Sequence, residues 1–137
     1  MASRTSARPL SPHLQIWRWG PHMLVSILHR ATGSGMATVG TMLLVWWLAA
    51  IASGAEAYAT FRDVFTTDSG ALNVLGWVIG VGLTWSLFQH LSNGVRHLFM
   101  DVGAGFELKT TKTTSIAAIV AAVVLTIGYW LYIVLAK

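Results

Sequence analysis

Three long stretches without Asp, Glu, Lys or Arg constrain this chain more than any other feature of its sequence. They cover residues 31–55, 69–95 and 113–136, and contain 25, 27 and 24 residues. Each is longer than the roughly 20 apolar residues that a helix needs to cross a bilayer. We therefore predict an all-α membrane protein with three transmembrane helices, at about residues 21–53, 70–100 and 113–136. The first is extended back to Pro21 because the residues before the charge-free stretch are also apolar, and proline suits an opening helical turn.

The composition of the whole chain agrees with this class of protein. Of its 137 residues, 55% are hydrophobic and only 10% are charged, against a charged share of about 25% in soluble domains. The chain has no cysteine, which excludes disulfides, thiolate-ligated iron–sulfur clusters and covalently attached c-type haem. We expect one membrane-anchor domain over residues 1–137, in which residues 1–20 form a soluble N-terminal arm that is irregular over residues 3–12. Three spans enclose no large cavity, so a partner subunit is expected.

The few cations predict how the chain sits in its bilayer. The formal net charge is +4, but the basic residues form no run, so we expect no nucleic-acid partner. Three crossings place seven Lys and Arg on one side and two on the other, and cytoplasmic loops carry the excess of positive charge. The N-terminus and the connection between the second and third helices are therefore predicted on the cytoplasmic or matrix side, and residues 53–70 on the outer side. The first apolar stretch is too long for the core of a cleaved secretory signal.

One ionisable side chain, His90, lies well inside the second predicted span. An unpaired imidazole is costly in hydrocarbon, so such residues usually face a bundle interior, a proton path or a metal. Gly94 and His97 fall on the same helical face as His90. This face suits a b-type haem, with His90 Nε2 on the iron, Gly94 leaving space for the porphyrin and a polar group below for the propionates.

Two other interpretations of the second helix remain open. His90 could instead hydrogen-bond to a neighbouring helix. Gly76, Gly80 and Thr84 recur at four-residue spacing, which is typical of a small-residue stripe for close helix packing in membranes. Helix packing and haem binding are compatible with each other, so the stripe does not exclude the haem.

A second candidate site lies where the first helix enters the membrane. Ser26 and Arg30 are four residues apart and therefore share a helical face. A hydroxyl and a guanidinium at the edge of the hydrocarbon could bind the oxygens of a quinone, whose ring needs an apolar slot with a few placed polar groups. The alternative is that Arg30 extends to the lipid phosphates while Ser26 bonds back to its own helix.

Two motifs give the chain a family resemblance. The first is RPLSPHLQIW at residues 8–17, followed by SILHRATG at residues 26–33; the second is HxxxGxRHLxxD, which begins at His90. Together with three predicted helices, these motifs make the chain resemble the cytochrome b membrane-anchor subunit of succinate dehydrogenase, the larger of the two small anchors of respiratory complex II. The aromatic residue that closes the first motif is usually Tyr in that family, and Trp17 replaces it here.

The resemblance implies a role for each candidate residue. His90 would be one axial ligand of a haem b, with the second imidazole supplied by the other anchor subunit, so that this chain alone is haem-deficient. Ser26 and Arg30 would form part of the ubiquinone site. His29, Arg30 and His97 would meet the haem propionates or water near the quinone. Arg96 and Asp101 would stabilise the helix end or pair with a neighbouring subunit.

The resemblance also implies the partners and the place of the chain. A flavoprotein subunit would oxidise succinate, and an iron–sulfur subunit would pass the electrons to quinone at this membrane surface. No residue of this chain is expected to be catalytic in the dehydrogenation, since the sequence has no flavin motif and no cysteine cluster. A bacterial inner membrane is favoured over a mitochondrial one. The alternatives are a purely structural anchor that binds neither haem nor quinone and a small proton or solute carrier; a single deep ionisable group argues against the carrier.

Overall fold

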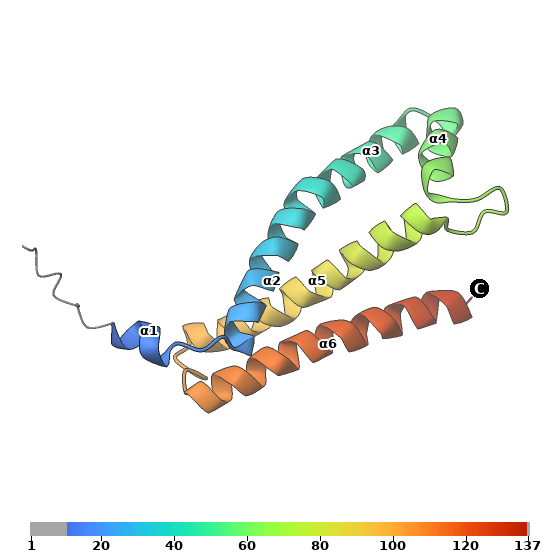
Figure 1. The fold of residues 1–137 in the computed structure, drawn as a ribbon. Coiled ribbons are helices and arrows are strands. Elements are labelled where there is room, and N and C mark those ends of the chain that lie inside the picture. Colours follow the sequence, from blue (N-terminus) through green and yellow to red (C-terminus); the bar gives the residue numbers. More distant parts are fainter. Residues whose placement is uncertain (1–10, 137) are drawn as a thin grey trace, which may run out of the picture.

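The architecture is a set of long helices, seen in a computed structural model that describes residues 11–136 (Figure 1). Three helical stretches are long and apolar enough to cross a bilayer: Pro21–Ser53, Val74–Asp101 and Leu108–Leu135. The first consists of α2 (Pro21–Gly35), a π-helical segment η1 (Met36–Gly40) and α3 (Thr41–Ala52), and the others are α5 (Val74–Asp101) and α6 (Leu108–Leu135). The prediction of an all-α protein with three membrane-spanning helices is confirmed.

The helices and the charge-free stretches do not end at the same residues. Helix α5 begins at Val74, four residues after the expected Gly70, and α6 begins at Leu108, five residues before the expected Thr113. Lys109 and Lys112 therefore lie within α6. The absence of charge marks the part of a helix that can sit in hydrocarbon, whereas the hydrogen-bonded helix itself can continue into the polar interface.

The N-terminal arm contains one short helix, which the sequence reasoning did not predict. Helix α1 (Pro12–Ile16) follows Ser11 and has proline in its first turn. Most of the predicted irregular segment, residues 3–10, lies outside the described residues. After α1 the chain is extended at Trp17, and Pro21 opens α2 directly after the extended Gly20.

The predicted outer connection, residues 53–70, is largely helical. Helix α4 (Ala55–Phe65) starts after a sharp turn at Gly54, whose φ of 103° lies in the left-handed region that favours glycine. Aromatic rings hold α4 against α3: the ring centroid of Trp46 lies 4.9 Å from that of Phe61 and 6.0 Å from that of Phe65. The connection is therefore a packed element and not a free loop.

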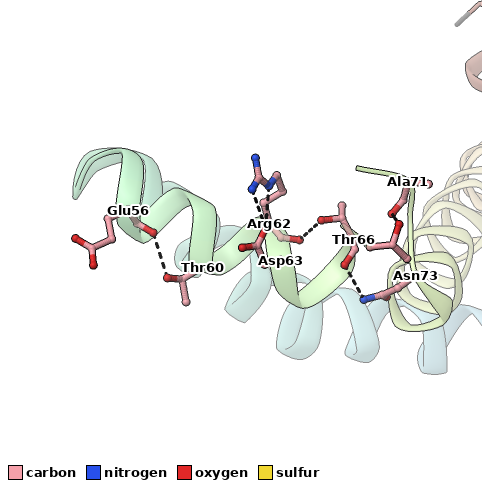
Figure 2. Close-up of polar contacts among 8 residues, drawn as sticks. Glu56, Thr60, Arg62, Asp63, Thr66, Ala71 and Asn73 are labelled. Atoms are coloured by element: carbon pink, nitrogen blue, oxygen red, sulfur yellow. Dashed lines mark hydrogen bonds and ion pairs between the residues drawn. The ribbon is translucent and has the colours of Figure 1, made fainter. Parts of the chain in front are cut away.

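Asn73, whose side-chain nitrogen is drawn bonded to the carbonyl oxygen of Thr66 in Figure 2, joins the end of α4 to the start of α5. Its side-chain oxygen accepts a hydrogen bond from the backbone N–H of Gly76 at 2.9 Å, which caps α5. Its side-chain nitrogen donates to the carbonyl oxygen of Val64, also at 2.9 Å. The same side chain thus satisfies backbone groups of both helices, and this cap explains why α5 begins at Val74.

The packed part of the bundle is formed by α2, α5 and α6, which all approach one another. Helix α3 approaches α4 but neither α5 nor α6, and in Figure 1 the first span leans away from the other two beyond η1. Among the described residues, the buried apolar side chains are only Val25, Ala50, Ala118 and Ala122. Most large apolar side chains point outward, as expected where lipid or another subunit covers the surface.

Two glycines of α5 permit close contact with two different neighbours. A Cβ at Gly76 would collide with the backbone oxygen of Phe65, while a Cβ at Gly80 would lie 3.0 Å from the indole ring of Trp130 on α6. Thr84 donates its hydroxyl proton to the carbonyl of Gly80 at 2.7 Å. Close packing is therefore real at Gly76 and Gly80, but it is not a single stripe against one helix.

Candidate functional site

Three histidines from two helices meet where α2 packs against α5. The rings of His29 and His90 are stacked, with centroids 3.8 Å apart and an interplanar angle of 11°. The ring of His97 lies 5.5 Å from that of His29 at an angle of 43°. The three histidines named from the sequence thus form one group, which we call the histidine cluster.

Helix geometry accounts for the histidine cluster. His90 and His97 are seven residues apart, so they lie two turns apart on nearly the same face of α5. His29 shares a face of α2 with Val25, which is fully buried. That face is directed into the bundle, so the imidazole of His29 comes to rest against α5.

The two ring nitrogens of His90 have different surroundings. Nδ1 lies 3.1 Å from the backbone carbonyl oxygen of His29 and 3.5 Å from the hydroxyl oxygen of Thr32. A carbonyl oxygen can only accept, so this bond requires that Nδ1 carries the proton. The hydroxyl proton of Thr32 goes to the carbonyl of Leu28 at 2.7 Å, which leaves the Thr32 oxygen as an acceptor toward Nδ1. In a neutral imidazole, Nε2 then keeps its lone pair.

The alternative role for His90, a hydrogen bond to a neighbouring helix, is present in the structure. This bond and metal ligation do not compete, because each uses a different nitrogen. Ligating histidines commonly donate their other N–H to a carbonyl, which fixes the tautomer and the ring orientation. The surroundings of His90 thus match those of a metal ligand as well as those of a packing residue.

Two glycines lie near His90, and they differ in their neighbours. A Cβ at Gly33 on α2 would lie 2.8 Å from Cε1 and 3.2 Å from Nδ1 of His90. A Cβ at Gly94 would have no neighbour within 4 Å among the described residues. Gly33 therefore permits close contact between α2 and the imidazole, whereas Gly94 leaves open space one turn from His90.

Ser26 and Arg30 lie on α2 outside the histidine cluster. Ser26 is half-buried and Arg30 is exposed, and neither side chain hydrogen-bonds to any residue in the described part of the chain. Many other hydroxyls bond back to their own helix, as Thr32 does to Leu28, but Ser26 does not. The hydroxyl and the guanidinium are thus both open to a molecule outside this chain.

These residues fit a group that takes one ligand from this chain. Within residues 11–136, no set of three or more His, Asp or Glu side chains could surround a metal ion. A haem with two histidine ligands takes one imidazole on each side of its iron and lies in flat apolar surroundings, and His90 with the open space at Gly94 suits one of these two sides. Nδ1 of His29 is buried without a hydrogen-bond partner among the described residues, so this atom also remains to be satisfied.

Sequence reasoning missed four residues in or near this site. Thr32 and Gly33 stand in the quoted SILHRATG segment, but their contact with His90 appears only once α2 is packed against α5. Gln89 and Asn93 are completely buried, and neither carboxamide has a hydrogen-bond partner in the described residues. A signal for the last two was present, because two amides one helical turn apart within an apolar span are unusual.

The C-terminal part of α5, next to His97, is also tied to α6. Arg96 donates from Nε to the hydroxyl oxygen of Thr114 at 3.1 Å, whereas Asp101 is exposed. Beside Arg96, an open apolar groove of about 460 Å³ runs between α5 and α6. None of the histidines, Ser26 or Arg30 lines this groove, so it is separate from both candidate sites.

The chain is similar in sequence to known membrane subunits. A model of the family described as "Succinate dehydrogenase/Fumarate reductase transmembrane subunit" matches residues 4–129. The chain is 38% identical over 120 residues to the succinate dehydrogenase cytochrome b556 subunit of Paracoccus denitrificans, covering 88% of this chain and 87% of the relative. The corresponding subunit of Rickettsia felis is 33% identical over 123 residues, covering 90% of each chain. The mitochondrial cytochrome b560 subunit of Mus musculus is 34% identical over 120 residues, covering 87% of this chain and 68% of the relative.

Proposed function

The chain belongs to the succinate dehydrogenase/fumarate reductase transmembrane subunit family, and from this premise we propose that it holds one side of a haem b and forms part of a ubiquinone-reduction site. Its partners would be a flavoprotein subunit, an iron–sulfur subunit and a second small membrane-anchor subunit. The observation that carries the proposal is the environment of His90: Nδ1 is bonded to the His29 carbonyl, which leaves Nε2 as the ring nitrogen available to a metal.

In this proposal, each of the three histidines and Gly94 has its own role in binding the haem. Nε2 of His90 would ligate the iron, and the bond from Nδ1 would hold the ring in place. Gly94 would let the flat macrocycle approach α5. His29 and His97, on the side of the membrane where α2 begins, would hydrogen-bond to the propionates. When bound, a haem b can accept and release one electron.

The quinone half of the proposal rests on Ser26 and Arg30. The hydroxyl of Ser26 can donate to one quinone oxygen, and the Arg30 guanidinium can stabilise negative charge that develops on the ring oxygens during reduction. Both groups are open to a ligand, and a guanidinium stays charged at every physiological pH. The rest of the pocket would come from the iron–sulfur subunit and the second anchor.

The orientation and compartment complete the proposal. Seven cations against two support an N-terminus on the cytoplasmic side, which is where a soluble dehydrogenase would dock. Relatives from Paracoccus denitrificans and Rickettsia felis support a multi-pass protein of the bacterial inner membrane.

The haem claim is tested on the purified complex. A dithionite-reduced minus oxidised spectrum should show the α-band of a b-type cytochrome, and the chain expressed without the second anchor should show little of it. Absence of the band from the assembled complex would support the purely structural anchor instead.

The quinone claim is tested by two substitutions. Ser26→Ala and Arg30→Ala should impair reduction of ubiquinone while leaving succinate oxidation by a soluble artificial acceptor nearly unchanged. Ser34→Ala, farther along α2, and Arg62→Ala, on α4, are the matched controls. A parallel loss of both activities would point to failed assembly and count against quinone binding.

A further inference from the structure

We propose that Gly33 and Thr32 on α2 are positioning residues for the imidazole of His90, and that they set how it presents Nε2 to a metal. The inference rests on the proposed function, because it concerns the same imidazole. It gives two further residues of α2 a function that they exert through their contacts with His90.

Helices α2 and α5 approach so closely at His90 that no space remains for a side chain at residue 33. The imidazole of His90 occupies the place where a side chain on residue 33 would be, with Cε1 only 2.8 Å from the position of a Cβ. Real Cβ atoms essentially never approach so closely, and all the atoms that a Cβ would meet belong to the His90 ring itself. Any side chain at residue 33 must therefore turn His90 or push the two helices apart.

Contacts with α2 also fix the rotation of the His90 ring. Nδ1 of His90 points to two acceptors on α2, the carbonyl of His29 at 3.1 Å and the hydroxyl oxygen of Thr32 at 3.5 Å. Thr32 is nearly fully buried, and its bond to the Leu28 carbonyl fixes which way its lone pairs face. The stacked ring of His29 covers one side of the imidazole. Three separate contacts thus determine the ring plane.

The hydrogen bond at Nδ1 also affects how strongly Nε2 donates electrons to a metal. An imidazole that donates Nδ1–H to an oxygen is a more basic ligand at Nε2. A more basic ligand favours ferric over ferrous iron. Loss of an acceptor should therefore raise the midpoint potential of a bound haem, whereas a displaced ring should change the ligand field and weaken retention of the haem.

The experiment compares Gly33→Ala with Gly35→Ala in the purified complex. Both substitutions add one methyl group to α2, but a Cβ at residue 35 has no neighbour within 4 Å. Gly33→Ala should shift the g-values of the low-spin haem and weaken haem binding by about 10-fold, the lower end of the range of about 10- to 100-fold typical when the surroundings of a ligating histidine are disturbed. Gly35→Ala should match the wild-type complex in both measurements.

A second pair of variants keeps the test decisive if Gly33→Ala fails to assemble. Thr32→Val removes the hydroxyl at nearly constant volume and should raise the midpoint potential, whereas Thr32→Ser keeps the hydroxyl and should restore the wild-type value. Succinate oxidation with a soluble acceptor reports assembly independently of the haem.

The outcomes separate this inference from the function on which it rests. Absence of haem from the wild-type complex would overturn both the proposed function and the positioning role. A normal haem spectrum in the His90→Ala complex would also overturn both. If wild-type haem is normal and depends on His90, but Gly33→Ala and Thr32→Val leave its g-values and potential unchanged, the positioning role alone is wrong.

Discussion

At the scale of single residues, His90 shows what spacing can and cannot predict. The repeat along one helix was enough to place Gly94 and His97 on its face, because both lie on the same rigid element. The contacts with Gly33, Thr32 and the His29 carbonyl come from another helix. Sequence spacing cannot predict them, since they depend on the rotation and depth at which α2 packs against α5.

Gln89 and Asn93 give a prediction at the same scale. Both are completely buried, and their amides lack partners within residues 11–136. Replacing such a group with an apolar side chain of similar shape should remove a desolvation cost of about 1–3 kcal/mol. Asn93→Leu should therefore keep or raise the thermal midpoint of the purified complex.

The matched control for Asn93→Leu is Asn73→Leu. Asn73 caps α5 and bonds to the end of α4, so its loss should cost about 1 kcal/mol, a typical value for a helix cap, and lower the midpoint. A lower midpoint for Asn93→Leu as well would mean that its amide has a partner in the assembled complex.

At the scale of helices, the apolar stretches predicted the number of spans, because length and lack of charge are what a bilayer demands. They did not predict α4 or η1. Helix α4 carries charges and is held by the ring contacts of Phe61 and Phe65 with Trp46, which join residues distant in sequence. The segment η1 follows Gly33 and Gly35 and widens one helical turn, a local change that leaves no periodic signal.

Gly76 allows a test of the packing between the start of α5 and the end of α4. Its missing side chain lets the start of α5 pass the backbone of Phe65. Gly76→Ala should therefore destabilise the connection between α4 and α5 by about 1–3 kcal/mol, and protease should cut residues 66–72 faster. In Gly82→Ala, on the same helix, a Cβ meets nothing within 4 Å, so cleavage should stay at the wild-type rate. Equal cleavage of both variants would contradict the proposed close approach.

At the scale of the whole molecule, the surface is mainly apolar and the packed core is small. Within residues 11–136, α2, α5 and α6 all pack against one another, while α3 diverges. Composition predicted this need for lipid and partner subunits, since three spans cannot bury their own apolar surface. Which face receives each partner depends on subunits whose sequences are not part of this chain.

The orientation can be tested because the chain has no cysteine. Single variants Asp68→Cys and Glu107→Cys place a thiol at opposite ends of α5. In intact spheroplasts, a membrane-impermeant maleimide should label Asp68→Cys, and it should label Glu107→Cys only after the membrane is opened. The reverse pattern would contradict the orientation derived from the cations.

The most direct test of the account is the haem content of the complex after His90→Ala, measured by the pyridine haemochrome method beside His13→Ala. His13 lies exposed on α1, so its variant should retain the wild-type ratio of haem to flavin. The His90→Ala complex should lose the haem or give an altered haem spectrum, while succinate oxidation with a soluble acceptor persists. A wild-type haem content and spectrum in His90→Ala would mean that the ligand lies elsewhere.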